Sequence, residues 1–309
     1  MEKEPVVYVN GKFTEKSKAS VSVFDHGLLY GDGIFEGIRA YRGSVFRLDD
    51  HMNRLYDSAQ SIRLKIPQTK HEMTEAVLET LRKNRLRDAY IRIVVTRGVG
   101  DLGIDPSLCK DPTVFIITEP MIISFGPKEP RVVRLMVSSY RRDAVDATSH
   151  EIKSLNYMNS ILARIEARSA GADDAILLDH RGFVSESTVT NIFVVKDGKI
   201  ATPSTAAGIL HGITRERIIK LCSDLGLEVQ ERDVTPFELA TADELFLVGT
   251  KSEILAVGSV TGSKVGTGGV GPLTKKLYQE FSRVTQHPEE GTPIYEAESV
   301  SVKGPPRFQ

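Results

Sequence analysis

The chain has 309 residues, enough for one large domain or two ordinary domains with a sizeable core. Its 40 Lys and Arg residues balance 41 Asp and Glu residues, so neither a nucleic-acid partner nor a membrane surface is indicated. It also lacks a membrane-length apolar run, a signal-peptide core and a cysteine framework, having only Cys109 and Cys222, which predicts a cytoplasmic protein without a bound metal.

The first third of the sequence alternates strand and helix patterns. Strands are predicted at residues 6–11, 12–14, 34–41, 45–48, 90–97 and 113–118. The helical spacing of Leu48, His51, Met52 and Leu55 predicts a helix with Asp49 as its N-cap, and a second helix is predicted over residues 70–84. These elements predict a small α+β domain over residues 1–118.

The rest of the sequence predicts a larger α/β domain over residues 131–285. Residues 119–130 hold three prolines and no periodicity, so they are the candidate interdomain linker. Strands are predicted at residues 131–139, 175–178, 191–195 and 245–248, and helices at residues 157–170 and 213–225. Met158, Ile161, Leu162 and Ile165 predict the buried face of the first helix. The polar tail, residues 286–309, is expected to be disordered or docked.

The segment from Lys153 to Asn191 carries the most chemistry. Lys153 could form an imine with an aldehyde, the Tyr157 hydroxyl could reach a phenolic oxygen, and Glu186 could hold a pyridine nitrogen protonated. These are the parts that a pyridoxal phosphate enzyme needs. Each residue also has a simpler interpretation, with Lys153 as a surface charge before a helix capped by Asn156, and Glu186 as an exposed turn carboxylate.

Four further features of the sequence could bind anions. Gly212-Ile-Thr-Arg215 opens a helix, where free amides attract phosphate, although Thr214 fits a simple N-cap equally well. Thr250 follows an apolar strand and could grip an anion, but with Glu253 it also matches a capping box at a helix start. Arg54 suits phosphate and Arg92 suits a carboxylate, while both could equally lie on solvated faces.

Taken together, the motifs resemble the class IV (fold type IV) pyridoxal phosphate aminotransferases, most closely the archaeal-type branched-chain amino acid aminotransferases. The segments that carry the resemblance are Asp25–Arg39, His51–Arg54, Tyr90–Arg92, Lys153–Tyr157, Glu186 with Asn191-Ile-Phe, Gly212–Arg215 and Gly249-Thr250. The resemblance spans roughly Val6 to Phe281. It implies a small α+β domain, a larger pseudo-barrel α/β domain and a cofactor between them.

The resemblance also implies residue roles. Lys153 would carry the cofactor and shuttle the α-proton, Tyr157 would contact its phenolic oxygen and Glu186 its pyridine nitrogen. The phosphate would be bound by Arg54, the amides of Ile213 and Thr214, and Thr250. The substrate pocket would include Tyr30, Phe35, Gly37, Arg92, Leu102, Thr250 and Lys251, with Leu102 approaching from a long loop of the same or of a neighbouring subunit. Members are usually homodimers or hexamers built of dimers.

Two departures from the family pattern concern the substrate range. Ser187-Thr-Val-Thr190 is bulkier than the small residues expected after Glu186, and Lys251-Ser252 replace small residues after Thr250. Lys251 could favour acidic substrates, but solvent exposure is the preferred interpretation because lysine is rarely buried.

The leading functional prediction is transfer of the amino group of L-leucine, L-isoleucine or L-valine to 2-oxoglutarate. Arg92 is the candidate for accepting the γ-carboxylate. The alternatives are a D-amino acid or (R)-amine transaminase, an aminodeoxychorismate lyase-like enzyme, and a non-catalytic pyridoxal phosphate binder.

Overall fold

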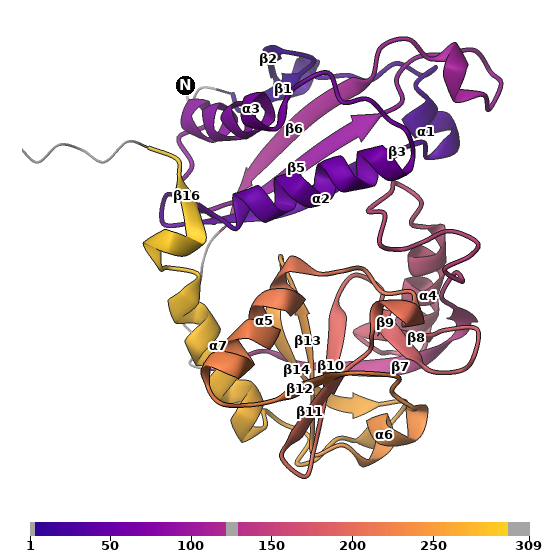
Figure 1. Ribbon diagram of the computed structural model, residues 1–309, viewed down its shortest axis with the longest axis vertical. Coiled ribbons are helices and arrows are strands. Elements are labelled where there is room, and N and C mark those ends of the chain that lie inside the picture. The colour runs from indigo at the N-terminus through magenta and orange to yellow at the C-terminus, as the bar shows by residue number, and fades with distance from the viewer. Residues whose placement is uncertain (1–3, 122–128, 296–309) are drawn as a thin grey trace, which may run out of the picture.

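The computed structural model describes residues 4–121 and 129–295, and it contains two β-sheets stacked one above the other (Figure 1). The upper sheet has seven strands and the lower sheet has nine. Each has its own cluster of buried apolar side chains. The predicted combination of an α+β unit with a larger α/β unit is therefore confirmed. Within the described residues, no helix has the length and apolarity needed to cross a membrane.

The seven-stranded sheet is formed mainly by the first 120 residues. Its strands are β1 (Val6–Val9), β2 (Lys12–Glu15), β3 (Gly33–Tyr41), β4 (Ser44–Phe46), β5 (Ala89–Thr96), β6 (Thr113–Pro120) and β16 (Gly291–Pro293). They are hydrogen-bonded in the order β16-β4-β3-β5-β6-β1-β2, and all the pairs are antiparallel. The β1–β2 and β3–β4 hairpins turn at Asn10-Gly11 and Arg42-Gly43, where each residue has the positive φ that such tight turns require.

Two helices, α2 (Leu48–Ser61) and α3 (Lys70–Lys83), pack against one face of this sheet, and a short helix, α1 (His26–Tyr30), precedes β3. Alternation along β5 sends Ile91, Ile93 and Val95 into that apolar cluster, so Tyr90 and Arg92 lie on the opposite face. The N-cap expected at Asp49 is wrong. The N-cap is Arg47, two residues earlier and in a left-handed conformation, and helix α2 begins at Leu48.

The nine-stranded sheet is mixed. Its strands are β7 (Val132–Arg141), β8 (Asp174–Leu178), β9 (Val184–Ser187), β10 (Asn191–Lys196), β11 (Lys199–Thr202), β12 (Val229–Glu231), β13 (Glu244–Gly249), β14 (Glu253–Val260) and β15 (Ser263–Lys264). The order is β12-β11-β10-β13-β14-β7-β8-β9, with β15 added beside β14. The helices of this unit are α4 (Met158–Ser169), α5 (Ile213–Asp224), α6 (Pro236–Thr241) and α7 (Pro272–Val284). Short 3-10 turns occur at Lys16–Lys18, Pro106–Leu108, Thr205–Ala207 and Pro288–Glu290.

Helix α4 buries a different face from the one predicted. Met158, Ile161 and Ile165 are exposed, whereas the buried positions are Ser160, Ala163 and Ala167. Small side chains allow the helix to lie close against β7 and β8, and they form a small cluster with Ala175 and Leu177. The apolar pattern thus marked the outer face of the helix.

Two predicted helix caps are also absent. Thr250 and Glu253 do not start a helix, because residues 250–252 form the turn between antiparallel strands β13 and β14. Asn156 does not cap α4, since Tyr157 occupies the N-cap position and Asn156 instead donates to the Gly31 carbonyl at 3.2 Å. The side chains of Thr250 and Asn156 therefore do not cap a helix and can make other contacts.

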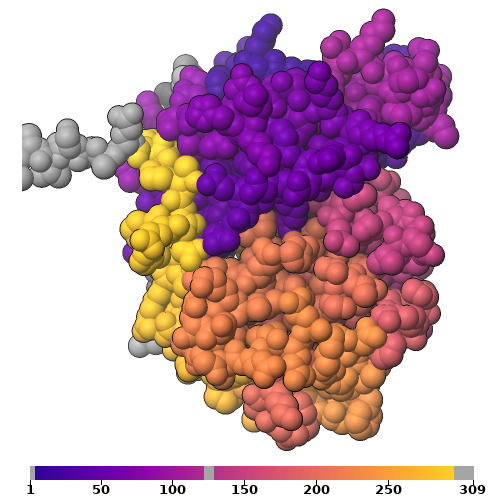
Figure 2. Space-filling model, in the orientation of Figure 1, coloured from indigo at the N-terminus to yellow at the C-terminus, as the bar shows by residue number. Residues whose placement is uncertain are grey.

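The C-terminal part of the chain joins both units. Helix α7 packs beside α5 on the lower unit, and the chain then rises so that β16 pairs with β4 in the upper sheet. Figure 2 shows this yellow segment running along the edge of both lobes. Residues 286–295 are thus docked. The proposed linker, residues 119–130, lies largely outside the described residues, as do residues 296–309.

Candidate active site

A cavity of about 730 Å³ lies between the two units. Residues of both sheets line it, and so do the turns that follow β9 and β13. The residues predicted for the site that line this cavity are Phe35, Gly37, Arg54, Arg92, Lys153, Tyr157, Glu186, Ile213, Thr214, Thr250 and Lys251. Tyr30 and Leu102 are not among the lining residues.

The Lys153 segment is held by the backbone of strand β3. The Phe35 amide donates to the Lys153 carbonyl at 3.0 Å, and the Leu155 amide donates to the Gly33 carbonyl at 2.9 Å. A Cβ at Gly33 would lie 2.7 Å from the Leu155 side chain, so only glycine allows this close approach. The upper sheet therefore fixes the lysine at the cavity wall.

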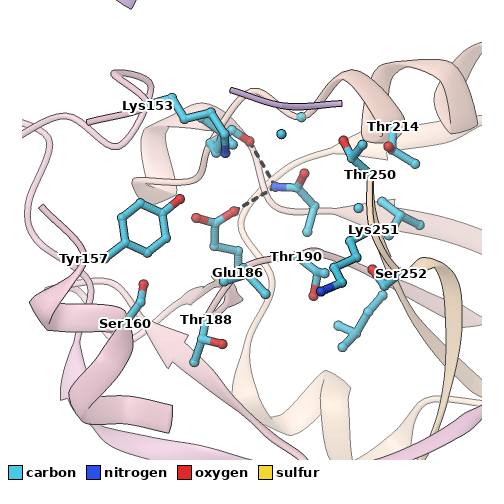
Figure 3. A pocket seen from close by; sticks show the side chains of 18 of the residues that line it. Lys153, Tyr157, Ser160, Glu186, Thr188, Thr190, Thr214, Thr250, Lys251 and Ser252 are labelled. Atoms are coloured by element: carbon cyan, nitrogen blue, oxygen red, sulfur yellow. Dashed lines mark hydrogen bonds between the residues drawn. The ribbon is translucent and has the colours of Figure 1, made fainter. Parts of the chain in front are cut away.

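The environment of Lys153 and Tyr157 alters their acidity. Burial, aided by the charge of Arg54, lowers the pKa of Lys153 to about 8. Burial, together with the carboxylate of Glu186, raises the pKa of Tyr157 to about 12. Lys153, Tyr157 and Glu186 converge in one region of the cavity (Figure 3). At neutral pH the tyrosine is a hydrogen-bond donor, and an appreciable fraction of the lysine is a neutral amine.

Glu186 is buried in strand β9, with 6 % of its surface exposed, so it is not the exposed turn residue of the simpler interpretation. Its Oε2 accepts from Asn191 Nδ2 at 2.9 Å, and its Oε1 lies 3.3 Å from Arg142 Nη2. Burial raises the pKa of the Glu186 carboxyl, and Arg142 opposes that rise. A cationic or N–H group of a ligand would therefore find a fixed and poorly solvated acceptor here.

Arg54 projects from α2 into the cavity from a fixed support. Its Nε and Nη2 donate to the buried Glu36 carboxylate at 2.8 and 2.9 Å, and its Nη1 donates to the His211 carbonyl at 2.8 Å. His51 Nδ1 lies 2.7 Å from the same carboxylate. Burial opposes ionisation of Glu36, but Arg54 and His51 prevail and hold its pKa well below the usual range. Three of the five guanidinium N–H groups are thus used, which leaves two for a ligand.

The start of helix α5 presents free backbone donors to the cavity. Gly212 is the N-cap, without a side-chain cap bond, so the first amides of the helix lack intrahelical acceptors. The simple interpretation of Thr214 as the N-cap is therefore wrong. A Cβ on Gly212 would lie 2.1 Å from Asn191 Oδ1, so glycine is needed here. Thr214 and Thr250 lie near each other in Figure 3.

The wall formed by the upper sheet combines aromatic and cationic groups. Arg92 Nη2 donates to the Tyr90 hydroxyl at 3.1 Å, and the guanidinium lies 4.4 Å from the centre of the Phe35 ring. Lys251 Nζ lies 5.5 Å from the centre of the Tyr90 ring. Lys251 is exposed and yet lines the cavity, so it stands at the mouth. Gly37 leaves space for the Tyr90 hydroxyl, which would be 2.3 Å from a Cβ there.

Tyr30 and Leu102 contact each other away from the cavity. The Tyr30 hydroxyl donates to the Leu102 carbonyl, and both side chains are exposed. A single copy of the chain therefore does not bring these two predicted substrate residues to the site.

The unusual turn after Glu186 is internally satisfied. The Ser187 amide donates to the Thr190 carbonyl at 2.9 Å, and their hydroxyls are 2.7 Å apart. The Thr188 hydroxyl donates to Asp174 at 2.7 Å. The hydroxyl groups thus pin the turn rather than loosen it.

Sequence reasoning assigned no role to Arg142, Glu36 or Asn191, although each supports a cavity residue. The sequence gives a weak indication for Glu36, because a carboxylate inside an apolar strand needs a buried cation. It gives no indication for Arg142, which follows directly on Arg141 at a strand end and resembles a surface residue.

A two-sheet fold with a lysine, a carboxylate and a helix N-terminus around one interdomain cavity defines a class of enzyme. The family model Amino-transferase class IV matches residues 33–260, and the chain belongs to that family of aminotransferases.

Individual proteins similar to this chain point to a narrower group within the family. A protein of Methanocaldococcus jannaschii named "Putative branched-chain-amino-acid aminotransferase" is 54 % identical over 278 residues, which cover 90 % of this chain and 96 % of that protein. The solved T.th. branched-chain amino acid aminotransferase with pyridoxamine 5'-phosphate matches with a TM-score of 0.91 and 35 % identity, covering 95 % of this chain and 99 % of that one. The same enzyme complexed with N-(5'-phosphopyridoxyl)-L-glutamate gives 0.89 and 35 %, with the same coverage.

Proposed function

We propose that the chain is a branched-chain amino acid aminotransferase that passes the amino group of L-leucine, L-isoleucine or L-valine to 2-oxoglutarate. The observation that carries the proposal is a lysine with its pKa lowered to about 8, in the same cavity as a buried carboxylate. The names of the relatives described above support the substrate class.

Pyridoxal 5'-phosphate is the proposed cofactor, and the cavity suits it. The Ser252 hydroxyl is buried without a hydrogen-bond partner among the described residues, as expected for a wall that faces a polar ligand. The N-terminus of α5 and the two spare donors of Arg54 suit a phosphate dianion. When bound, this cofactor supplies an electron sink for the charge left when the α-proton departs.

Three residues are proposed to act at the ring end of the cofactor. Lys153 would carry the cofactor and, as a neutral amine, accept and return the α-proton. Tyr157 would donate its hydroxyl hydrogen to the phenolic oxygen, since its raised pKa keeps it protonated. Glu186 would accept from a protonated pyridine nitrogen, and Asn191 and Arg142 would hold its oxygens in place.

The phosphate end is proposed to rest on the remaining donors. These are Arg54, the amides of Ile213 and Thr214, and the Thr250 hydroxyl. The Arg54 guanidinium already joins α2 to the segment before α5 through the His211 carbonyl. A phosphate bound by Arg54 and by the first amides of α5 would add a second link between these elements.

Substrate recognition is proposed at the aromatic wall. Phe35 would offer its ring to the aliphatic side chain, Gly37 would leave room for the Tyr90 hydroxyl on the same wall, and Arg92 would donate to the γ-carboxylate of glutamate. The amides of Thr250 and Lys251 would receive the α-carboxylate. Tyr30 and Leu102 would complete the site from a neighbouring copy, in a homodimer or a hexamer of dimers. A cytoplasmic location remains part of the proposal.

The test incubates the cofactor-loaded protein with L-leucine and 2-oxoglutarate and measures glutamate. We expect turnover, and we expect Lys153→Ala to reduce it by roughly 10⁴-fold or more, since no other group would supply the base. Turnover of D-amino acids or simple (R)-amines without turnover of L-leucine would contradict the proposal. A cofactor spectrum that does not respond to any amino acid would indicate a non-catalytic binder.

A further inference from the structure

A chain of polar contacts runs from Asp143 to Glu186 behind the proposed cofactor site. Arg142 is central to it and is buried, with 2 % of its surface exposed. Its Nη2 lies 3.3 Å from Glu186 Oε1 and donates to the Ser187 carbonyl at 3.0 Å. The orientation of this guanidinium therefore determines how much positive charge the Glu186 carboxylate meets.

The other side of the guanidinium meets a histidine. Arg142 Nη1 donates to the Ser160 hydroxyl at 3.1 Å and lies 3.5 Å from His150 Nδ1. His150 Nε2 is 2.9 Å from Asp143 Oδ2. A carboxylate can only accept, so Nε2 carries the hydrogen and Nδ1 turns its lone pair toward Arg142. Asp143 thus selects the tautomer that can accept from the arginine.

The charge state of His150 matters to this arrangement. Burial lowers the pKa of His150, the Arg142 charge lowers it further, and Asp143 opposes both. Among residues 4–121 and 129–295, the charged groups that face the histidine are Arg142 and Asp143, and helix α4 contributes the neutral Ser160 and Asn159 to the same network. Protonation would place an N–H where the acceptor was and add a like charge beside the guanidinium.

We propose that His150, oriented by Asp143, is a positioning residue that holds Arg142 against Glu186 and so sets the strength with which Glu186 binds the cofactor ring nitrogen. The inference rests on the proposed role of Glu186. When His150 is protonated, Arg142 is displaced and Glu186 loses its opposing charge. Its carboxyl then takes up a proton more easily and holds the ring nitrogen less firmly.

Cofactor affinity as a function of pH provides the test. The dissociation constant of pyridoxal 5'-phosphate is measured between pH 5 and pH 8 for the wild type, His150→Asn and His150→Ala. Asparagine can keep an acceptor near the Nδ1 position but cannot titrate. We expect the wild type to weaken relative to His150→Asn by about two- to tenfold as the pH falls, the size of one lost hydrogen bond. His150→Ala should be weaker by a similar factor already at pH 7.5.

The inference would be overturned if the ratio of the wild-type dissociation constant to that of His150→Asn stayed constant between pH 5 and pH 8. It would also be overturned if His150→Ala bound the cofactor as tightly as the wild type at pH 7.5. If both variants merely melt earlier while these ratios stay constant, His150 serves only to pin residues 143–151.

A second measurement is independent of the cofactor. Nitrogen-15 NMR of the cofactor-free chain should find His150 protonated at Nε2 and titrating below its ordinary value of about 6.5. A hydrogen on Nδ1 at neutral pH would overturn the inference even if the cofactor binds. A chain that binds no cofactor would instead contradict the proposed function, and the tautomer would still decide the role of His150.

Discussion

At the scale of single residues, the site is made of a few reactive groups and of less obvious residues that hold them. Lys153, Glu186 and Arg54 could be picked from the sequence because their residue types and order match a known chemistry. Arg142 and Asn191 could not be given roles, since holding a carboxylate in place leaves no spacing rule in the sequence. Glu36 lies between, because its place in an apolar strand already implies a buried cation.

The lowered pKa of Lys153 predicts how cofactor capture depends on pH. Only the neutral amine attacks an aldehyde, so the capture rate should rise with pH and level off above a midpoint near 8, the pKa that burial gives this lysine. Stopped-flow absorbance with the cofactor-free protein measures this rate, and Lys153→Ala serves as the blank. A midpoint near 10.5, the ordinary lysine value, would show that the amine is fully hydrated.

The two cations of the aromatic wall, Arg92 and Lys251, should contribute unequally to the binding of 2-oxoglutarate. Arg92 is partly buried, and its loss in Arg92→Gln should raise the KM for 2-oxoglutarate by roughly tenfold or more, as for a lost charged hydrogen bond. Lys251 is exposed at the mouth, so Lys251→Met should raise it by only about two- to fivefold. The matched control is 4-methyl-2-oxopentanoate, which lacks the second carboxylate. An equal change for both acids would assign these cations to the α-carboxylate.

At the scale of elements, the sequence predicted most strands and helices but erred on details that depend on the neighbours. Helix α4 shows why: its larger apolar residues, Met158, Ile161 and Ile165, point outward because Ala163 and Ala167 permit closer packing on β7 and β8. Periodicity reveals that a helix has two faces but not which one is buried. The Thr250–Glu253 pattern failed similarly, because pairing of β13 with β14 overrides a capping box.

The start of helix α5 has too little space for any side chain at Gly212. In Gly212→Ala, the new Cβ would collide with Asn191 Oδ1, which cannot easily move because its amide nitrogen donates to Glu186 and to the Leu210 carbonyl. We expect roughly tenfold weaker cofactor binding, a cost typical of overpacking. Equilibrium titration measures this. The control is Gly269→Ala, where the nearest atom is 3.8 Å away and no strain arises. Equal affinities in the two variants would contradict the prediction.

At the scale of the whole molecule, the upper unit exposes apolar side chains that a solitary chain would not need. They include Val23, Leu28, Leu102 and Ile104, the last with 82 % of its surface exposed. Such clustering is typical of a protein interface. It agrees with the proposal that a neighbouring copy supplies Tyr30 and Leu102 to the cavity.

This proposal predicts the effect of a charge at the exposed surface. Ile104→Glu should shift the oligomer toward smaller species, because a desolvated carboxylate is costly at an interface. Light scattering after size-exclusion chromatography measures the mass. The matched control is Phe237→Glu on α6, a residue with 74 % of its surface exposed but far along the chain from this cluster. An unchanged mass in Ile104→Glu, or a monomeric wild type, would contradict the prediction.

The pairing of β16 with β4 has a consequence for the order in which the protein is made. Gly291 pairs with Phe46, so nearly the whole chain must be synthesised before the upper sheet gains its last strand. Ribosomes add about 5–20 residues per second, so the edge of β4 stays open for on the order of 10–50 s. An open strand edge invites pairing with other chains. Pairing of β16 with β4 therefore protects this strand edge only late in synthesis, once residues 291–293 have been made.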